Sequence, residues 1–252
     1  MPDKDAFFSF QNSVENISDQ EYLQTSYYLE SIKAFARLSN NSVYIIDYKE
    51  KGFEYVSDNP LLLCGHSAKE VQQMGYDFYM KYVIKKDLDL LLKINQIGFD
   101  FYETIPLKEK KNYSISYDFH LKNQEGKRIL VNQKLTPLFL SDSGKIWKAL
   151  CLVSLSSSNH SGNIKIYKKG NQKFLEYNEE KHLWQSTQVI KLSNREKEII
   201  QLSIRGFTID EIAQEILLTN NTVKFHRKKL FEKLEVSNIT EAVSFARSNY
   251  LI

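Results

Sequence analysis

The most informative stretch of this chain is Thr219-Asn-Asn-Thr-Val-Lys-Phe-His-Arg-Lys-Lys-Leu-Phe-Glu-Lys-Leu234. At about 100° per residue, one face of a helix carries Val223, Leu230 and Leu234. The opposite face carries amide, aromatic and cationic side chains, and the stretch contains five Lys or Arg residues against the single acid Glu232. Such a helix can pack on a core with one face and lie in the major groove of DNA with the other.

Helix-capping signals surround this stretch. Ser193, Thr208 and Asn238 each stand three residues before a glutamate, which is the spacing of a capping box. Thr219 is the expected cap of the basic helix, and Gly206 is placed to end the first helix because a left-handed residue costs least at glycine. The pattern predicts an all-α module of four helices, at residues 194–204, 209–216, 220–234 and 239–248.

The C-terminal residues resemble the LuxR-type helix-turn-helix. The resemblance is carried by Leu192-Ser-x-Arg-Glu-x-Glu198, Gly206-Phe-Thr-x-x-Glu-Ile-Ala213, Thr219-x-Asn-Thr-Val-Lys-x-His226, Lys233-Leu-x-Val236 and Thr240-Glu-Ala-Val243. It implies a four-helix domain over residues 191–252 that binds double-stranded DNA, usually as a homodimer. The sequence departs from the family pattern at Glu235, where a glycine is more usual.

The resemblance implies that Lys224, Phe225, His226 and Lys228 face the groove and that Thr222 lies close to the DNA backbone. Helical angles agree for the two lysines, which can reach guanine edges or phosphates, and Phe225 fits against thymine methyls. His226 falls nearer the buried side, so a core or phosphate-bonding role and a base contact both stay open. Together the predicted DNA-binding residues are Asn221, Thr222, Lys224, Phe225, His226, Arg227, Lys228 and Lys229, with Arg227 and Lys229 assigned to phosphates.

Residues 39–157 have the pattern of a sheet-containing domain. Two short β-rich runs at 43–48 and 52–57 predict a hairpin, helical spacing follows over 59–97, and three long alternating runs come after it. A five-stranded antiparallel sheet with helices on one face closes this order, which makes the whole chain α+β. The order and length of these elements resemble a PAS sensor domain.

Three further segments flank this PAS-like domain. Residues 1–20 are polar and aperiodic, which predicts a flexible tail. Residues 21–38 predict a helix that either packs on the next domain or pairs with a second copy of itself. Residues 158–190 predict a linker with a hairpin at 163–177 that either extends the sheet or braces the linker.

Composition excludes several classes of protein. With 42% hydrophobic and 26% charged residues and a formal charge of +3, the chain is globular, and any basic surface is local. It has no signal-peptide pattern and no run approaching about 18 apolar residues, which predicts a cytoplasmic protein without a membrane partner. The two cysteines have no metal-type spacing, and nucleotide-loop and His-Glu-x-x-His motifs are absent, so no metal, cofactor or enzyme activity is predicted.

The sequence therefore predicts a DNA-binding transcriptional regulator whose PAS-like domain senses a signal or mediates dimerisation. The alternative is a signalling or interaction protein whose helix-turn-helix docks on a protein partner. Cations and amides opposite the core face favour DNA, since a protein-docking helix carries an apolar stripe there. For the PAS-like domain, a buried cavity above about 300 Å³ favours a small-molecule ligand, whereas a filled interior with an exposed apolar patch favours a protein partner.

Overall fold

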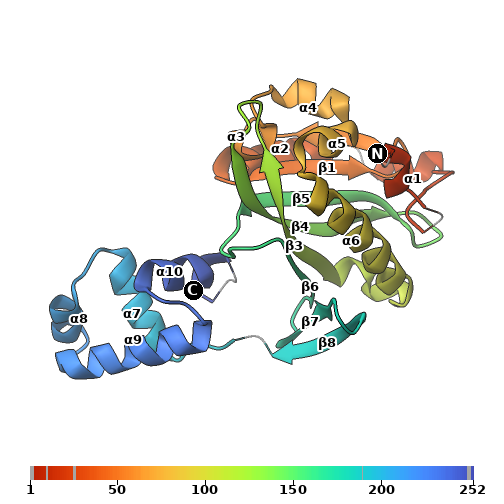
Figure 1. The fold of residues 1–252 in the computed structure, drawn as a ribbon. Coiled ribbons are helices and arrows are strands. Elements are labelled where there is room, and N and C mark those ends of the chain that lie inside the picture. The colour runs from red at the N-terminus through yellow and green to blue at the C-terminus, as the bar shows by residue number, and fades with distance from the viewer. Residues whose placement is uncertain (1–2, 10, 25–26, 189, 249–250) are drawn as a thin grey trace. The chain divides into compact units, whose positions relative to one another are not determined.

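The structure is a computed structural model that describes residues 3–9, 11–24, 27–188, 190–248 and 251–252. The chain divides into two compact units, one up to Thr187 and one from Gln188 onward, and each is described by itself (Figure 1). Within the described residues, no helix combines the length and the apolar character that a membrane crossing requires.

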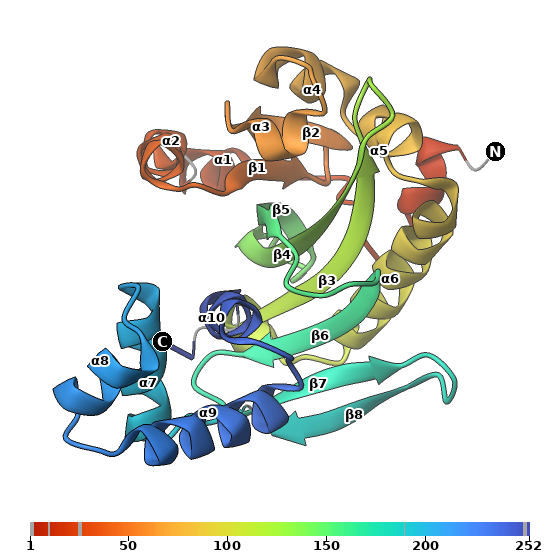
Figure 2. The same cartoon turned by 60° about the vertical axis from the view of Figure 1, so that its left-hand side comes forward.

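The first unit is built on one eight-stranded sheet with the order β2-β1-β5-β4-β3-β6-β7-β8 (Figures 1 and 2). The pairs with an assigned register, from β2 across to β7, are all antiparallel. The strands are β1 (Ser42–Asp47), β2 (Gly52–Val56), β3 (Tyr113–Lys122), β4 (Arg128–Leu140), β5 (Ile146–Leu155), β6 (Gly162–Lys168), β7 (Lys173–Asn178) and β8 (Leu183–Gln188).

The first five strands confirm the predicted α+β class and the PAS-like order of elements. The sheet then continues, because β6 pairs with β3 in a register that sets Ile166 opposite Ile115. The predicted hairpin thus extends the sheet. Strand β8 lies where the sequence predicted only a linker, and it is held by Trp184, whose ring centroid is 5.6 Å from that of Phe101 and 5.1 Å from that of Tyr177.

The helices between β2 and β3 pack against the sheet (Figure 2). The predicted capping box at Ser67 is present, with the Ser67 hydroxyl accepting from the backbone N–H of Glu70 at 3.3 Å. The longest helix buries Leu88, Leu91 and Ile94 against the sheet. These elements are α3 (Pro60–Leu63), α4 (Ala68–Met74), α5 (Asp77–Tyr82), α6 (Lys85–Glu103) and the 3-10 helix η2 (Leu107–Asn112).

The N-terminal segment differs from the predicted flexible tail. It contains η1 (Lys4–Phe7), and Phe7 is only 4% exposed, with its ring 5.3 Å from that of Tyr76. Burial of an aromatic side chain offsets the entropy of ordering these residues. The predicted helix at 21–38 is present as α1 (Asp19–Gln24) and α2 (Tyr28–Leu38), and its residues 25–26 lie outside the described residues.

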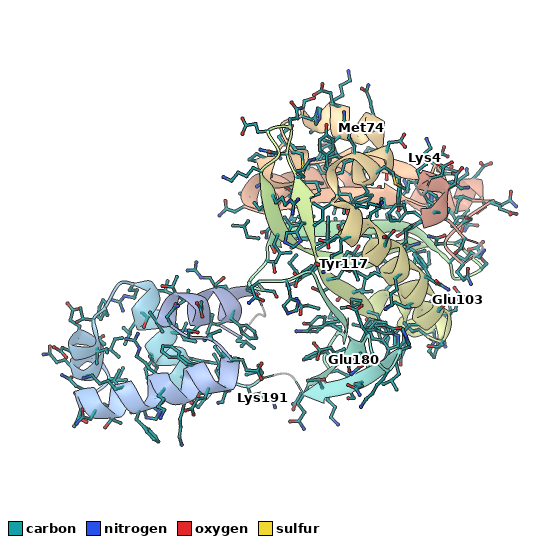
Figure 3. All side chains as sticks on the ribbon, viewed as in Figure 1. Lys4, Met74, Glu103, Tyr117, Glu180 and Lys191 are labelled. Carbon is teal, nitrogen blue, oxygen red and sulfur yellow. The ribbon has the colours of Figure 1, made fainter. Side chains whose placement is uncertain are left out.

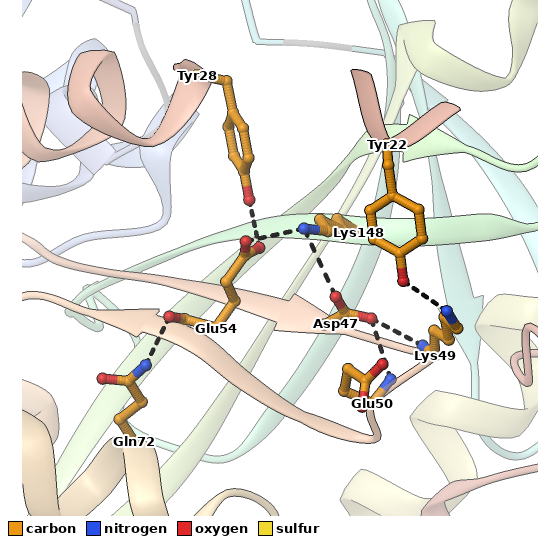
Figure 4. Close-up of polar contacts among 8 residues, drawn as sticks. All are labelled: Tyr22, Tyr28, Asp47, Lys49, Glu50, Glu54, Gln72 and Lys148. Carbon is orange, nitrogen blue, oxygen red and sulfur yellow. Dashed lines mark hydrogen bonds and ion pairs between the residues drawn. The ribbon is translucent and has the colours of Figure 1, made fainter. Parts of the chain in front are cut away.

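A charged group attaches α2 to the sheet (Figure 4). The buried ammonium of Lys148 lies 2.8 Å from a carboxylate oxygen of Glu54 and 3.6 Å from one of Asp47. The Tyr28 hydroxyl of α2 donates to Glu54. Burial raises the pKa of Asp47 above its usual value despite the bonds to Lys148 and to backbone N–H groups. The sequence gives no local signal for this group, because its members come from four separate elements.

The second unit contains the four predicted helices, α7 (Asn194–Ile204), α8 (Ile209–Glu215), α9 (Asn220–Leu234) and α10 (Ile239–Ser248). Both halves of the capping box are formed at Ser193 and at Thr208, and the Asn238 side chain accepts from the backbone N–H of Glu241 at 2.9 Å. Only the end of α8 departs from the prediction, by one residue. The core is formed by two clusters, one around Ile199, Ile212 and Val223 and one around Ile200, Leu230 and Leu234.

Candidate nucleic-acid interface

Helix α9 packs one face into the core of the second unit and exposes its opposite face to solvent. Val223 and Leu230 are fully buried, and Leu234 is 2% exposed. The Phe225 side chain is 53% exposed although it is aromatic. Of the predicted DNA-binding residues, those in solvent are Asn221, Lys224, Phe225, Lys228 and Lys229, and those half-buried are Thr222, His226 and Arg227.

Side-chain hydrogen bonds fix the start of α9. The Thr219 hydroxyl accepts from the backbone N–H of Thr222 at 3.2 Å and lies 2.8 Å from the Thr222 hydroxyl. The Asn220 amide donates to Asp210 at 2.5 Å, which ties the first turn of α9 to the first turn of α8. No acidic residue occupies the first turn of α9. Its positive dipole end therefore stays available to an anion such as a phosphate.

Two of the exposed lysines of α9, Lys224 and Lys228, make no strong ion pair in the free protein. Lys228 is 3.9 Å from Glu232, but their side chains are 78% and 64% exposed, so this pair is weak. Among the described residues, Lys224 has no ion-pair partner. Both ammonium groups can therefore turn to a DNA phosphate or base edge without breaking a strong bond.

The aromatic and half-buried side chains of α9 contact their neighbours on the same helix. The Lys229 ammonium lies 4.6 Å from the Phe225 ring centroid, and the His226 ring lies edge-on to Phe225 at 6.0 Å. The Arg227 guanidinium lies 5.7 Å from the Phe231 ring, and its burial lowers the pKa of Arg227. A guanidinium stays charged after such a shift, so Arg227 keeps its cation at the edge of the exposed face.

Lys233, the remaining cation of α9, is used inside the protein. Its ammonium lies 2.6 Å and 2.8 Å from the two carboxylate oxygens of Glu196 on α7. Glu196 also accepts from the backbone N–H of Ser193 at 2.7 Å, and it is 5% exposed. Lys233 thus joins α9 to α7 and does not belong to the exposed basic face. Sequence reasoning missed this pairing because the partners are 37 residues apart.

Two residues with left-handed backbone flank α9, and neither is a glycine. Leu217, in the turn between α8 and α9, has φ of 54° and a side chain that is 90% exposed. Glu235, immediately after α9, also has φ of 54° and places a negative charge at the helix C-terminus. Both positions therefore carry backbone strain, and at Glu235 the charge opposes the helix dipole.

We expect Leu217→Gly and Glu235→Gly each to stabilise the second unit by about 0.5–1 kcal/mol, because glycine removes the left-handed strain. The free energy of unfolding of this unit can be measured by hydrogen exchange of amides in α7 and α9. Gly206→Ala is the matched control, since φ there is 86° and an added Cβ meets nothing within 4 Å. It should destabilise by about 1 kcal/mol. Destabilisation by both glycine variants would contradict the strain argument.

The C-terminal residues match a known family. Residues 191–246 match the family model GerE, described as bacterial regulatory proteins of the luxR family. The CsgBAC operon transcriptional regulatory protein of Escherichia coli is 42% identical over 66 residues, which are 26% of this chain and 31% of that protein. The Fimbriae Z protein of Escherichia coli is 37% identical over 67 residues, which are 27% of this chain and 32% of that protein. The chain thus covers about a third of the length of these curated relatives.

A solved structure of the Vibrio cholerae VqmA dimer, a LuxR-type receptor, covers 88% of this chain and 88% of that chain at 17% identity. Its TM-score is 0.36.

Proposed function

We propose, on the premise that residues 191–246 form a luxR-family helix-turn-helix domain, that this chain is a DNA-binding transcriptional regulator. The observation that carries the proposal is the two-faced helix α9. Buried Val223 and Leu230 hold it in the core, while Lys224 and Lys228 stand in solvent beside the exposed Phe225 ring. Exposing an aromatic ring to water is unfavourable, but the same ring gains contact against a thymine methyl.

In this proposal the residues of α9 divide into two groups. Asn221, Lys224, Phe225 and Lys228 contact base edges in the major groove, and His226 shares this face in part. Thr222, Arg227 and Lys229 contact phosphates and fix the register of the helix on the duplex. The alternative is a helix that docks on a protein, which needs an apolar stripe on the exposed face. It is less well supported because, among the described residues of α9, Phe225 is the only apolar side chain that is more than half exposed.

We further propose that the regulator acts in the cytoplasm as a homodimer. Large apolar side chains on α2 are exposed, with Phe35 at 50% and Leu38 at 89%, and pairing with a second copy removes such surface from water. A two-fold dimer binds two half-sites in symmetric order.

Selection of duplexes from a random pool by the purified full chain tests the proposed function. We expect a symmetric motif with half-sites about one helical turn apart. A pool that shows no sequence enrichment, although the protein is folded, would reject sequence-specific DNA binding. An enriched motif without symmetry would retain DNA binding and reject the dimer.

A second candidate function, ligand sensing, is supported by a cavity in the first unit. The cavity has a volume of about 80 Å³ and lies between α6 and the sheet, where Figure 3 labels Tyr117. One water molecule needs about 10–15 Å³ of such space, so the cavity has room for several waters or for one small ligand. It is smaller than a pocket of about 300 Å³, and the volume alone therefore does not favour a drug-sized ligand.

Two buried oxygens on the cavity wall favour a small polar-tipped ligand. Within the described residues, the Tyr102 hydroxyl and Gln133 Oε1 lack a hydrogen-bond partner, and both residues line the cavity. The Gln133 amide nitrogen is already committed, since it donates to the Tyr117 hydroxyl at 2.7 Å. An unpartnered buried polar atom is costly. We therefore propose a small neutral ligand, mostly apolar, that donates a hydrogen bond to Gln133 Oε1.

Phenol is a suitable probe because it pairs an apolar ring with one hydroxyl. At ten times its Kd we expect phenol to stabilise the first unit of the wild-type chain by about 1.4 kcal/mol. Gln133→Leu should remove most of this gain, because the acceptor is lost. Toluene, which cannot donate, is the matched control and should not distinguish wild type from variant. Melting curves that phenol leaves unshifted in the wild type would count against the ligand.

A further inference from the structure

Sheet pairing brings two lysine-rich segments together at one end of the first unit. Tyr113, the first residue of β3, stands opposite Lys168 at the end of β6. Directly beyond this pair, the backbone N–H of Lys169 donates to the carbonyl of Asn112 at 2.8 Å. The turn between β6 and β7 therefore lies beside the end of η2, although about 60 residues of chain separate them.

The two segments contribute four exposed cations, and we call Lys108, Lys111, Lys169 and Lys173 the basic edge. The nearby acids are already occupied. Glu109 is paired with Lys168, and Glu176 lies 3.7 Å from Lys165. In the part of the chain that the structure describes, none of the four lysines pairs with a carboxylate. The basic edge is thus a local excess of positive charge on a chain whose formal charge is only +3.

The turn that carries Lys169 and Lys173 has the composition of a phosphate-contacting loop. Gly170 has φ of 82°, and an added Cβ would meet nothing within 4 Å, so glycine serves the backbone conformation and not the packing. Asn171 and Gln172 are both exposed. Amide and ammonium groups are the donors that position a protein on the DNA backbone.

The basic edge also lies where the chain leaves for the second unit. Strands β7 and β8 are neighbours that run in opposite directions, joined by a short turn after Asn178 (Figure 2). The start of β7 at Lys173 and the end of β8 at Gln188 are therefore at the same end of the sheet. From Gln188 to Asn194, where α7 begins, the chain can span at most about 20 Å. The chain that continues toward α7 thus leaves from the same end of the sheet that carries the basic edge.

We propose that the basic edge binds phosphates of the duplex on the flank of the site that α9 reads. This inference rests on the proposed DNA-binding function. The contacts release counterions from DNA, so they add affinity that depends on salt and not on sequence. The β6–β7 turn then acts as a second DNA-binding element, carried by the PAS-like unit.

Exposed lysines also occur on surfaces that bind nothing, where water solvates their charge. The salt dependence of binding separates the two explanations. Removing a lysine that contacts a phosphate makes the plot of log K against log salt concentration less steep by about 0.9. Removing a lysine that is only solvated leaves the slope unchanged.

The experiment compares full-length variants on two duplexes that carry the same selected motif, one of about 16 and one of about 40 base pairs, which differ in the number of flanking phosphates. On the long duplex, replacing all four basic-edge lysines by glutamine should make the slope less steep by about 0.9 for each lysine that contacts a phosphate. On the short duplex the change in slope should be smaller. Sequence preference should not change. The matched control is K122Q/K127Q/R128Q, three exposed cations at the opposite end of β3, whose slope should equal that of the wild type.

An unchanged slope for the four-lysine variant on the long duplex would overturn the proposal, as would an equal loss in the control. Failure of the proposed function looks different. If Lys224→Ala and Lys228→Ala leave binding intact, α9 is not the reading helix, whatever the basic edge does. If they abolish specific binding while the basic-edge variant behaves as the wild type, only the inference about the basic edge fails.

Discussion

Replacing Lys224 or Lys228 by alanine should weaken binding to the selected duplex by about 1–3 kcal/mol each, which is roughly 5- to 150-fold. Both ammonium groups stand in solvent on the face of α9 opposite Val223 and Leu230, so their removal leaves the core untouched. Fluorescence anisotropy on the labelled duplex gives the affinity. The free energy of unfolding should change by no more than surface substitutions usually cause, which is about ±0.5 kcal/mol.

Lys197→Ala is the control for loss of charge alone. Lys197 is exposed on α7 and belongs neither to α9 nor to the basic edge, so its removal should change the affinity little. Two kinds of contact can be told apart among the α9 lysines. Loss of a base contact relaxes sequence preference at one position, whereas loss of a phosphate contact weakens all sequences equally and makes the salt slope shallower. Undiminished affinity in both α9 variants would reject α9 as the reading helix.

Glu196→Ala should destabilise the second unit by about 2–3 kcal/mol, the largest stability effect we expect from the loss of one ion-pair partner. The substitution removes half of the capping box at Ser193 and leaves the Lys233 ammonium without its carboxylate partner. Removing one partner of a fully buried ion pair costs more than this. Here the cost is smaller because the Lys233 side chain is 37% exposed and can turn to water. Hydrogen exchange of α7 and α9 amides gives the change in unfolding free energy.

The same carboxylate makes the stability of this unit depend on pH. Burial raises the pKa of Glu196, but hydrogen bonds from Lys233 and Ser193 outweigh it, and the pKa lies below its usual value of 4.5. The folded state therefore binds the proton less tightly than the unfolded state. The stabilisation is present in full above the unfolded pKa and is lost as pH falls through the folded pKa.

Glu196→Gln should remove most of this acid-induced loss, while Glu198→Ala serves as the matched control. Glu198 pairs with Arg195 at 2.8 Å, but the two side chains are 44% and 46% exposed, so its loss should cost less than about 0.5 kcal/mol. Equal costs for the two alanine variants would show that the bond to Lys233 contributes nothing beyond an ordinary exposed pair.

The second unit was predictable almost residue by residue, because its signals are local. A capping box such as Ser193 with Glu196 lies within one helical turn, and the face shared by Val223, Leu230 and Leu234 follows from the helical period alone. The same locality made the exposed positions of α9 visible in the sequence.

The first unit was predictable in its order of strands and not in its extent. Alternation identifies a strand, but it does not say which neighbour the strand pairs with, so the pairing of Ile166 with Ile115 had no signal. Burial of Phe7 against Tyr76 is equally non-local. The segment was predicted to be a flexible tail because its composition is polar and aperiodic. The unpartnered oxygens of Tyr102 and Gln133 appear only once the interior is packed.

Helix periods, caps and turns act over a few residues, and the sequence therefore establishes α9, its two faces and the strands of the PAS-like core. Long-range pairing depends on which distant segments bury each other. It is this pairing that commits Lys233 to Glu196 and leaves Lys224 and Lys228 available. It also brings the β6–β7 turn beside η2, so that lysines about 60 residues apart form one basic edge.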